Sequence, residues 1–319
     1  MDFEHKGRRF GGRGNQRVVY VCHCRLTPIY IIVKMKEITK RTITGAVYVL
    51  SVIVAVCFNR YIAAAYFAIV AALGLKEFLS IAKQNGIKLN QPMVYLCATL
   101  LYCSVAASCF PLDLVCEQWF LICNVLRLAF FAAVLCLIIA SLYTQTDKPF
   151  TSLAYSLTSL AYVVFPLALS NVLFDVGAEG GFNLLLAVFV FAWCNDTFAY
   201  LVGCKFGKHR LFERHSPKKS WEGFFGGLAA TLLAAGVVFW IEGGNLLFWH
   251  LIALIVSIVG TFGDLVESMF KRQMGVKDSG NILPGHGGIL DRFDILLTVL
   301  PAVWIVVELF TMITWKMIY

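Results

Sequence analysis

The sequence predicts an all-α fold, a polytopic membrane bundle of about nine transmembrane helices. Of its 319 residues, 59% are hydrophobic and only 14% are charged, and the mean hydropathy is +0.76. A soluble domain carries about 25% charged residues to cover its surface. The chain therefore has little room for a soluble domain beside its membrane-spanning part.

A helix needs about 20 mainly apolar residues to cross a bilayer. Nine stretches reach or approach that length, and the first two are short. The fourth contains Arg127, which we expect to mark a helix boundary or to face the bundle interior, because a charge in lipid is costly. The predicted stretches are 43–58, 61–80, 92–112, 118–143, 151–174, 182–202, 223–241, 245–263 and 293–315.

The first 34 residues do not fit this pattern. They are basic, and their apolar patch at 29–33 is too short to span a membrane. Met35 opens a more typical start just before the first predicted span. We expect residues 1–34 to be a basic extension, either disordered or the product of a mis-assigned start, and 35–319 to form one transmembrane domain.

Basic and acidic loops alternate along the chain. Cytoplasmic loops of membrane proteins carry an excess of Lys and Arg. If the N-terminus is cytoplasmic, nearly every basic loop falls on the cytoplasmic side, with Arg60 as the main exception. Both long polar loops then lie on that side of a multi-pass protein. A prokaryotic inner (plasma) membrane is the simplest setting, and an organelle membrane is the alternative.

The eleven cysteines are scattered, and most lie in apolar stretches. They lack the spacing of a disulfide framework, and Cys22-His23-Cys24 is too short to form a zinc site alone. The cysteines are therefore interpreted as packing or lipid-facing residues.

The first polar cluster begins inside an apolar stretch, at Asn195 and Asp196. Ionisable residues at such positions usually serve a function, and the alternative is a structural hydrogen bond between helices. Further on, Ser216, Lys218 and Lys219 precede the seventh stretch, which Ser220 is expected to cap. Lysines at a helix N-terminus favour a phosphate site. The alternative is a basic flank that meets anionic lipid headgroups.

The second cluster is richer in charge. Asp264 closes the eighth stretch, and Asp291 and Asp294, spaced i, i+3, share a face at the start of the ninth. Carboxylates that meet between neighbouring helices favour Mg²⁺, with nucleotide phosphates completing its shell. Nearby basic residues and close-approaching glycines suit phosphoryl-type transfer better than a solvated loop, whose surface ion pairs contribute only about 0–1 kcal/mol each. These residues are Lys271, Arg272, Lys277, Arg292, Gly285, Gly287 and Gly288.

The segment from Ser268 to Asp294 resembles the signature of the phosphatidate cytidylyltransferase (CDP-diglyceride synthase) family. It reads Ser, two residues, Lys-Arg, four residues, Lys-Asp, then Leu-Pro, His-Gly-Gly and Asp-Arg-x-Asp. The resemblance covers about 35–319 and leaves 1–34 outside. Four further segments are similar to this family, namely 41–45, 195–197, 216–222 and 263–268.

The resemblance implies a homodimeric, Mg²⁺-dependent nucleotidyltransferase of phospholipid biosynthesis, with one or two cations and a cytoplasmic site. Its substrates would be CTP and phosphatidic acid. It would be surrounded by membrane lipids and would not bind nucleic acid. A phosphatidate oxygen would attack the α-phosphorus of CTP and release pyrophosphate. The implied metal ligands are Asp264, Asp291 and Asp294, which with Lys271 and Arg272 are the implied catalytic residues. The implied substrate-binding residues are Ser216, Lys218, Lys219, Lys277, His286, Gly287, Gly288, Arg292, Asn195 and Asp196.

Three other functions compete with this interpretation. A CTP-dependent polyprenol kinase would share the metal and the nucleotide but release CDP, and the complete 268–294 signature argues against it. A membrane transporter would need a midplane site, often with paired broken helices, which the sequence lacks. A CDP-alcohol phosphotransferase would need an Asp-Gly-x-x-Ala-Arg run, which is also missing.

Overall fold

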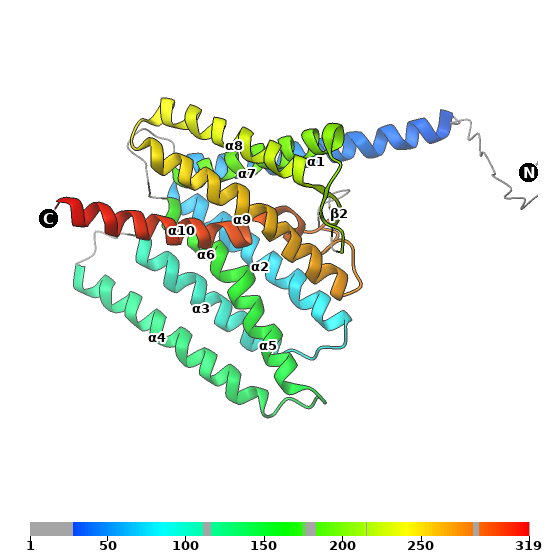
Figure 1. The fold of residues 1–319 in the computed structure, drawn as a ribbon. Coiled ribbons are helices and arrows are strands. Elements are labelled where there is room, and N and C mark those ends of the chain that lie inside the picture. The colour runs from blue at the N-terminus through cyan, green and yellow to red at the C-terminus, as the bar shows by residue number, and fades with distance from the viewer. Residues whose placement is uncertain are drawn as a thin grey trace, which may run out of the picture. The chain divides into compact units, whose positions relative to one another are not determined.

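The computed structural model describes residues 28–110, 116–174, 176, 183–214, 216–282 and 287–318. The chain divides into a first unit, 1–39, and a second unit, 40–319, which holds every element from α2 onward. The described elements (Figure 1) are α1 (Pro28–Phe58), α2 (Arg60–Gln84), α3 (Gln91–Cys109), α4 (Cys116–Ser141), α5 (Pro149–Ser159), the π-helical turn η1 (Leu160–Val164), α6 (Phe165–Phe174), α7 (Leu184–Phe206), β1 (Arg210–Phe212), β2 (Ser216–Ser220), α8 (Trp221–Glu242), α9 (Leu246–Gln273) and α10 (Leu290–Ile318).

The all-α membrane bundle predicted from the sequence is confirmed. In the described part of the chain, eight helices are long and apolar enough to cross a membrane, with α5, η1 and α6 counted as one. The remaining predicted stretch, 43–58, coincides with the shorter apolar helix Thr42–Phe58 within α1. Of the predicted N-terminal extension, residues 1–27 lie outside the described residues, and the remainder belongs to the backbone of α1.

The prediction for Arg127 is wrong in both of its forms. Arg127 lies inside α4, neither at a helix boundary nor in the bundle interior, and its side chain is exposed. Arg127 stands near the middle of α4, on a face that does not pack against the rest of the described bundle. Most of α4 is exposed as well, with only 17% of its most apolar window buried.

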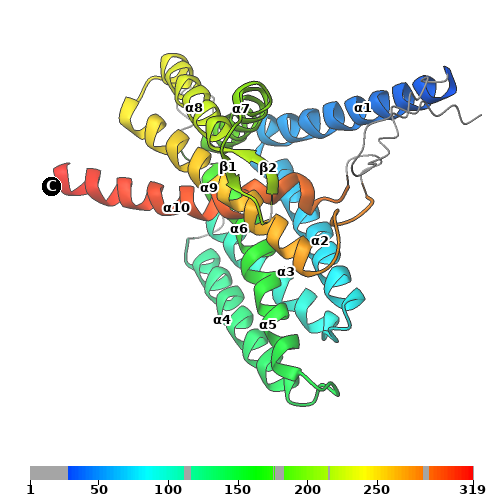
Figure 2. The same ribbon diagram turned by 45° about the vertical axis from the view of Figure 1, so that its right-hand side comes forward.

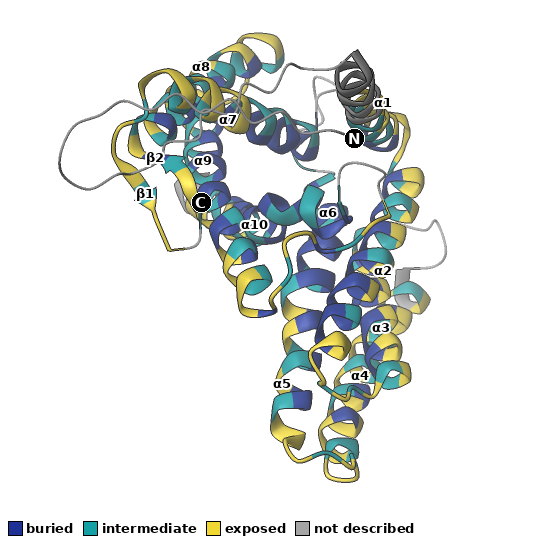
Figure 3. Ribbon diagram, turned by 90° about the vertical axis from the view of Figure 1, so that its right-hand side faces the viewer, coloured by how far each residue is buried: buried dark blue, intermediate teal, exposed yellow. Residues whose placement is uncertain are grey.

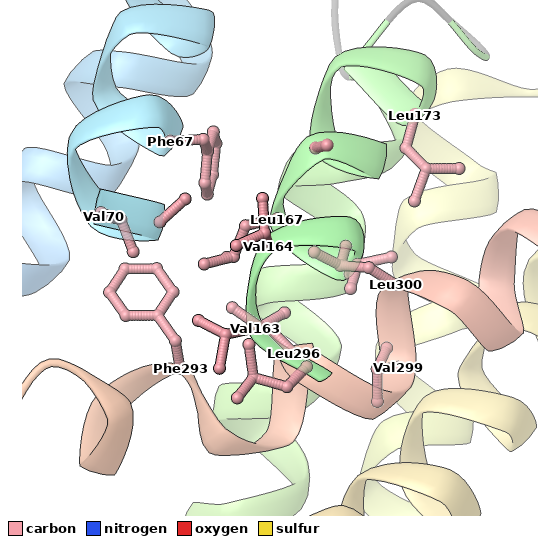
Figure 4. Packing of buried hydrophobic residues seen from close by; sticks show 14 of the residues in the cluster. Phe67, Val70, Val163, Val164, Leu167, Leu173, Phe293, Leu296, Val299 and Leu300 are labelled. Carbon is pink, nitrogen blue, oxygen red and sulfur yellow. The ribbon is translucent and has the colours of Figure 1, made fainter. Parts of the chain in front are cut away.

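The apolar core lies where α2, α6 and α10 meet. Figure 4 shows Phe67 of α2 facing Phe293 of α10, with Val163 and Leu167 between these helices. In Figure 3 the buried residues gather along the facing sides of the same helices. The π-turn η1 has a local cause: Pro166 has no N–H to donate, and the N–H of Phe165 bonds back to the carbonyl of Leu160.

Three of the loops predicted to be cytoplasmic meet at one end of the bundle. Asn85, after α2, donates from Nδ2 to the carbonyl of Met274, after α9 (3.1 Å). Lys88 donates from Nζ to the carbonyl of Gln145, after α4 (3.2 Å). The loops that precede α3, α5 and α10 therefore lie on the same side, as the charge pattern requires.

Helices α7, α8 and α9 pack against one another, and α10 packs on α9 (Figures 1 and 2). The approach of α9 to α10 depends on two glycines. A Cβ atom on Gly263 would collide with Oγ1 of Thr298, and one on Gly260 would lie 2.9 Å from Cγ2 of Ile295. This close packing brings the end of α9, with Asp264, beside the start of α10.

We expect Gly263→Ala to lower the thermal unfolding midpoint in detergent by several degrees, because the added methyl group must push α10 away from α9. Overpacking of this kind costs about 1–3 kcal/mol. Gly236→Ala is the matched control, since nothing lies within 4 Å of a Cβ atom there. Adding Thr298→Ala to Gly263→Ala should recover part of the loss, and equal midpoints for Gly263→Ala and Gly236→Ala would contradict the packing argument.

Candidate active site

A cleft of about 560 Å³ opens between α7, α8, the β1–β2 hairpin and α9. It brings together residues from both predicted polar clusters, although these lie far apart in the sequence. The predicted residues that line it are Asn195, Asp196, Lys218, Lys219 and Asp264.

Lys219 joins the hairpin to α9 on the cleft wall. Its ammonium lies 2.6 Å from Oδ2 of Asp264 and donates to the carbonyl of Thr261 (3.1 Å). The next residue, Ser220, caps α8 as predicted, since its Oγ accepts from the N–H of Gly223 (3.2 Å). The strand β2 thus places a cation between a carboxylate and a helix N-terminus, an arrangement suited to phosphate.

Asn195 and Asp196 lie next to each other on α7 but have different surroundings. Asn195 is buried, accepts from Oγ of Ser257 (2.6 Å) and donates to Oγ1 of Thr261 (3.5 Å). The interhelical hydrogen bond considered as an alternative for this segment is therefore present at Asn195. Asp196 is exposed on the cleft wall, where its carboxylate is available to a ligand.

Three carboxylates form a cluster at the junction of α9 and α10. Asp264, Glu267 and Asp294 each offer one oxygen, and these oxygens all lie within 4.8 Å of one another. Glu267 is 2% exposed and forms an ion pair with Lys271. Within the described part of the chain, its other oxygen, Oε1, has no hydrogen-bond partner. The cluster shares Asp264 with the cleft, so the two features form one continuous site.

Asp291 does not join the cluster in this structure. Its Oδ1 lies 2.7 Å from Nζ of Lys271, and its Oδ2 accepts from the backbone N–H groups of Ser279 and Gly288, both at 2.8 Å. Asp291 stands in the first turn of α10, where free N–H groups attract a carboxylate. The structure therefore places Glu267 where the sequence predicted Asp291, and links Asp291 to the cluster through Lys271.

Two acidic residues of this site were missed from the sequence. Glu267 is spaced i, i+3 from Asp264, so the face-sharing argument applied to Asp291 and Asp294 would have found it. Glu77 lies in α2, is 5% exposed, and accepts hydrogen bonds from Ser279 and from the start of α10. A charged residue inside an apolar stretch was the available signal for Glu77.

The remaining predicted residues surround this centre. Arg272 and Lys277 are exposed near the end of α9, and Ser216 is half-buried in β2. The carbonyl of Arg292 accepts from the hydroxyl of Tyr48 (3.1 Å). His286 lies outside the described residues. Of the three predicted glycines, Gly285 lies outside the described residues, Gly287 has a φ of 87°, which favours glycine, and Gly288 is buried against Glu77 and Ser279.

Glu222 does not line the cleft but holds the loop that does. Its carboxylate accepts from the backbone N–H groups of Lys208 (3.1 Å) and His209 (3.2 Å), and it lies 2.6 Å from Nδ1 of His209. Glu222 opens α8, so these contacts tie the loop after α7 to the helix that follows the hairpin. They hold both ends of the basic loop that carries Lys218 and Lys219.

The residues present fit a divalent cation. Three carboxylates so close together repel one another unless positive charge lies among them. Hard oxygen donors that supply only part of a coordination shell suit Mg²⁺ bound together with phosphates. The adjoining cleft adds lysines for those phosphates, so the arrangement suits phosphoryl-type transfer, in which positioning and charge neutralisation dominate.

Comparison with known proteins agrees with this chemistry. The profile of the cytidylyltransferase family matches residues 39–310. Proteins named phosphatidate cytidylyltransferase are similar over 164 residues, with 45% identity in Staphylococcus haemolyticus (strain JCSC1435), 44% in Staphylococcus aureus (strain COL) and 45% in Staphylococcus saprophyticus. In each case the similarity covers 50% of this chain and 62% of the relative. The family match extends over most of the chain, and the protein therefore belongs to the cytidylyltransferase family.

Proposed function

We propose that this protein transfers the cytidylyl group of CTP to phosphatidic acid, producing CDP-diacylglycerol and pyrophosphate for phospholipid biosynthesis. One observation carries the proposal: Lys219 pairs with Asp264 on the cleft wall, beside the three-carboxylate cluster. A phosphate-binding cation and metal-binding oxygens therefore meet at one place. Membership of the cytidylyltransferase family and the names of the staphylococcal relatives support the same reaction.

In this reaction an ionised oxygen of the phosphatidate phosphate attacks the α-phosphorus of CTP in line. A new P–O bond forms, the bond from the α-phosphorus to the oxygen bridging the β-phosphate breaks, and pyrophosphate leaves with the electron pair. A catalytic base is unnecessary, because phosphate monoester oxygens are largely ionised at neutral pH. Lys218 and Lys219 on the cleft wall would bind and orient the phosphates, and Asp196 would orient the lysines or bind a cation.

The proposed Mg²⁺ ligands are Asp264, Glu267 and Asp294, with Asp291 retained as a candidate because Lys271 links it to the cluster. When bound, the ion would neutralise negative charge on the phosphates, and a second cation would extend this effect. Lys271, in the last turn of α9, would balance the charge of Glu267 and Asp291. Arg272, at the end of α9, is proposed to bind phosphate together with Lys277, His286 and Arg292 from the loop and helix that follow.

The test is product formation by the purified protein in detergent with α-³²P-labelled CTP, Mg²⁺ and phosphatidic acid. Label in the lipid phase with pyrophosphate in the aqueous phase, and loss of both in Asp264→Asn, would establish the transfer. Label that stays in water as CDP while a polyprenol becomes phosphorylated would support a CTP-dependent kinase instead. Untouched CTP with folded protein would refute both enzymes and leave transport as the next activity to measure.

We further propose that the protein lies in an inner (plasma) membrane as a homodimer, with its N-terminus and the site loops in the cytoplasm. The hydrogen bonds that join the basic loops after α2, α4 and α9 support one common side for them. An epitope inserted after Glu213, in the turn of the hairpin, should be accessible to antibody in inside-out vesicles and protected in right-side-out vesicles. The opposite pattern would reverse the orientation. Cross-linking in the native membrane should give a dimer, and monomer alone would refute the homodimer.

A further inference from the structure

Glu77 is a buried carboxylate whose oxygens are both bound by residues from the other end of the chain. It lies on α2 and is 5% exposed. Its Oε1 accepts from the N–H of Ile289 (2.9 Å), and its Oε2 accepts from the N–H of Leu290 (3.0 Å) and from Oγ of Ser279 (3.0 Å). Burying a carboxylate is unfavourable unless such donors compensate, so these contacts fix its surroundings.

The hydrogen-bond donors to Glu77 show that it binds the start of α10. Ile289 and Leu290 form the start of α10, where backbone N–H groups have no partner within the helix and the helix dipole favours negative charge. Asp291 follows in the first turn of α10, and Asp294 stands in the second. The point at which α10 begins, and therefore the position of Asp294 in the carboxylate cluster, depends on this contact with α2.

Asp291 forms the second half of the same arrangement. Its Oδ2 accepts from the N–H of Gly288 and from both the N–H and the Oγ of Ser279. The Ser279 hydroxyl has one hydrogen and lies 3.0 Å from both carboxylates, so it bridges Glu77 and Asp291. The two carboxylates together join Ser279, after α9, to the residues that begin α10. We name this arrangement the Glu77 clamp.

The clamp is closely packed. A Cβ atom on Gly280 would lie within 3 Å of the Glu77 carboxylate, and one on Gly288 would collide with both Glu77 and Ser279. The backbone approaches the carboxylate too closely for any larger residue at either position. This fit indicates that Glu77 is adapted to the segment it holds and is more than a charge tolerated in the core.

We propose that Glu77 is a positioning residue for the catalytic centre. It anchors the start of α10 and the chain at Ser279, and thereby holds Asp294 against Asp264 and Glu267, and Asp291 against Lys271. Glu77 touches neither the cleft nor the carboxylate cluster, so it acts through these residues. The expected effect of Glu77 on catalysis rests on the proposed cytidylyl transfer. Its expected effect on the position of α10 and Ser279 does not.

The first measurement is hydrogen exchange of the intact protein in detergent, which needs no activity. Glu77→Gln keeps the size of the side chain but replaces one acceptor oxygen by an NH₂ group that faces donors. The N–H groups of Ser279, Ile289 and Leu290 should then exchange about tenfold faster or more, while α7 and α8 keep their wild-type rates. Lys76→Gln is the matched control, because Lys76 is the exposed neighbour on the same helix.

The second measurement is the Mg²⁺ dependence of CDP-diacylglycerol formation. Glu77→Gln should lower kcat at least tenfold and raise the Mg²⁺ concentration for half-maximal rate severalfold, and Glu77→Asp should fall between it and the wild type. A role in stability alone would reduce the amount of folded enzyme without moving the Mg²⁺ requirement. Unchanged exchange at Ser279 and Leu290, or an unchanged Mg²⁺ requirement in an active enzyme, would overturn the proposal. If the wild type makes no CDP-diacylglycerol, the proposed function fails, and the exchange experiment alone decides whether the clamp exists.

Discussion

Asp264→Asn is expected to reduce the rate of CDP-diacylglycerol formation by about a thousandfold, since a bound metal supplies several kcal/mol of charge stabilisation. Asp264 is the residue shared by the cleft and the carboxylate cluster, so one substitution affects both. Asparagine preserves the shape but removes the charge that pairs with Lys219 and that would bind Mg²⁺. Initial rates with labelled CTP at saturating substrates measure this loss.

The control for this prediction is Glu213→Gln, which removes an exposed carboxylate from the turn of the hairpin. It should keep wild-type rates and the wild-type Mg²⁺ requirement. Both variants should elute as the wild type does in size-exclusion chromatography, so that the comparison concerns chemistry and not folding. If Asp264→Asn retains more than about a tenth of the activity, Asp264 does not bind the metal in the reacting complex.

The helices were predictable because their signal is local. A run of apolar residues long enough to span a membrane leaves few alternatives for its backbone, which must form its own hydrogen bonds. The nine stretches therefore coincide with the helices of the described residues, and the predicted cap at Ser220 is present. The hairpin of β1 and β2 lacked such a signal, because its basic residues show no apolar alternation.

The site residues were predictable where a charged residue interrupts an apolar stretch. The prediction was uncertain where a carboxylate could either bind a metal or accept hydrogen bonds at a helix start. Asp291 and Asp294 share a helix face, but Asp291 also stands in the first turn of α10, where free N–H groups bind it instead. Glu77 lies about two hundred residues away from its partners in the sequence. Its contacts follow from how α2 packs beside α10, which a single sequence does not reveal.

Lys271→Met is expected to be the most destabilising single substitution at this site. The ammonium of Lys271 lies between the carboxylates of Glu267 and Asp291, whose side chains are 2% and 7% exposed. Removing it leaves two buried carboxylates without their common cation. Breaking a buried ion pair in this way costs about 3–5 kcal/mol, which corresponds to a fall of roughly 10 °C in the thermal unfolding midpoint. Thermal unfolding of the purified protein in detergent measures this change.

Lys277→Met is the control, because this exposed lysine lies on the loop that follows α9 and its loss should change stability by about 0.5 kcal/mol or less. The double variant Lys271→Met with Glu267→Gln should regain much of the lost stability, because one of the two unpaired charges disappears. It should nevertheless be inactive if Glu267 belongs to the metal-binding cluster. Recovery of stability without recovery of activity would mean that these buried charges are kept for catalysis rather than for folding. Recovery of both would remove Glu267 from the set of metal ligands and leave Asp291 as the third.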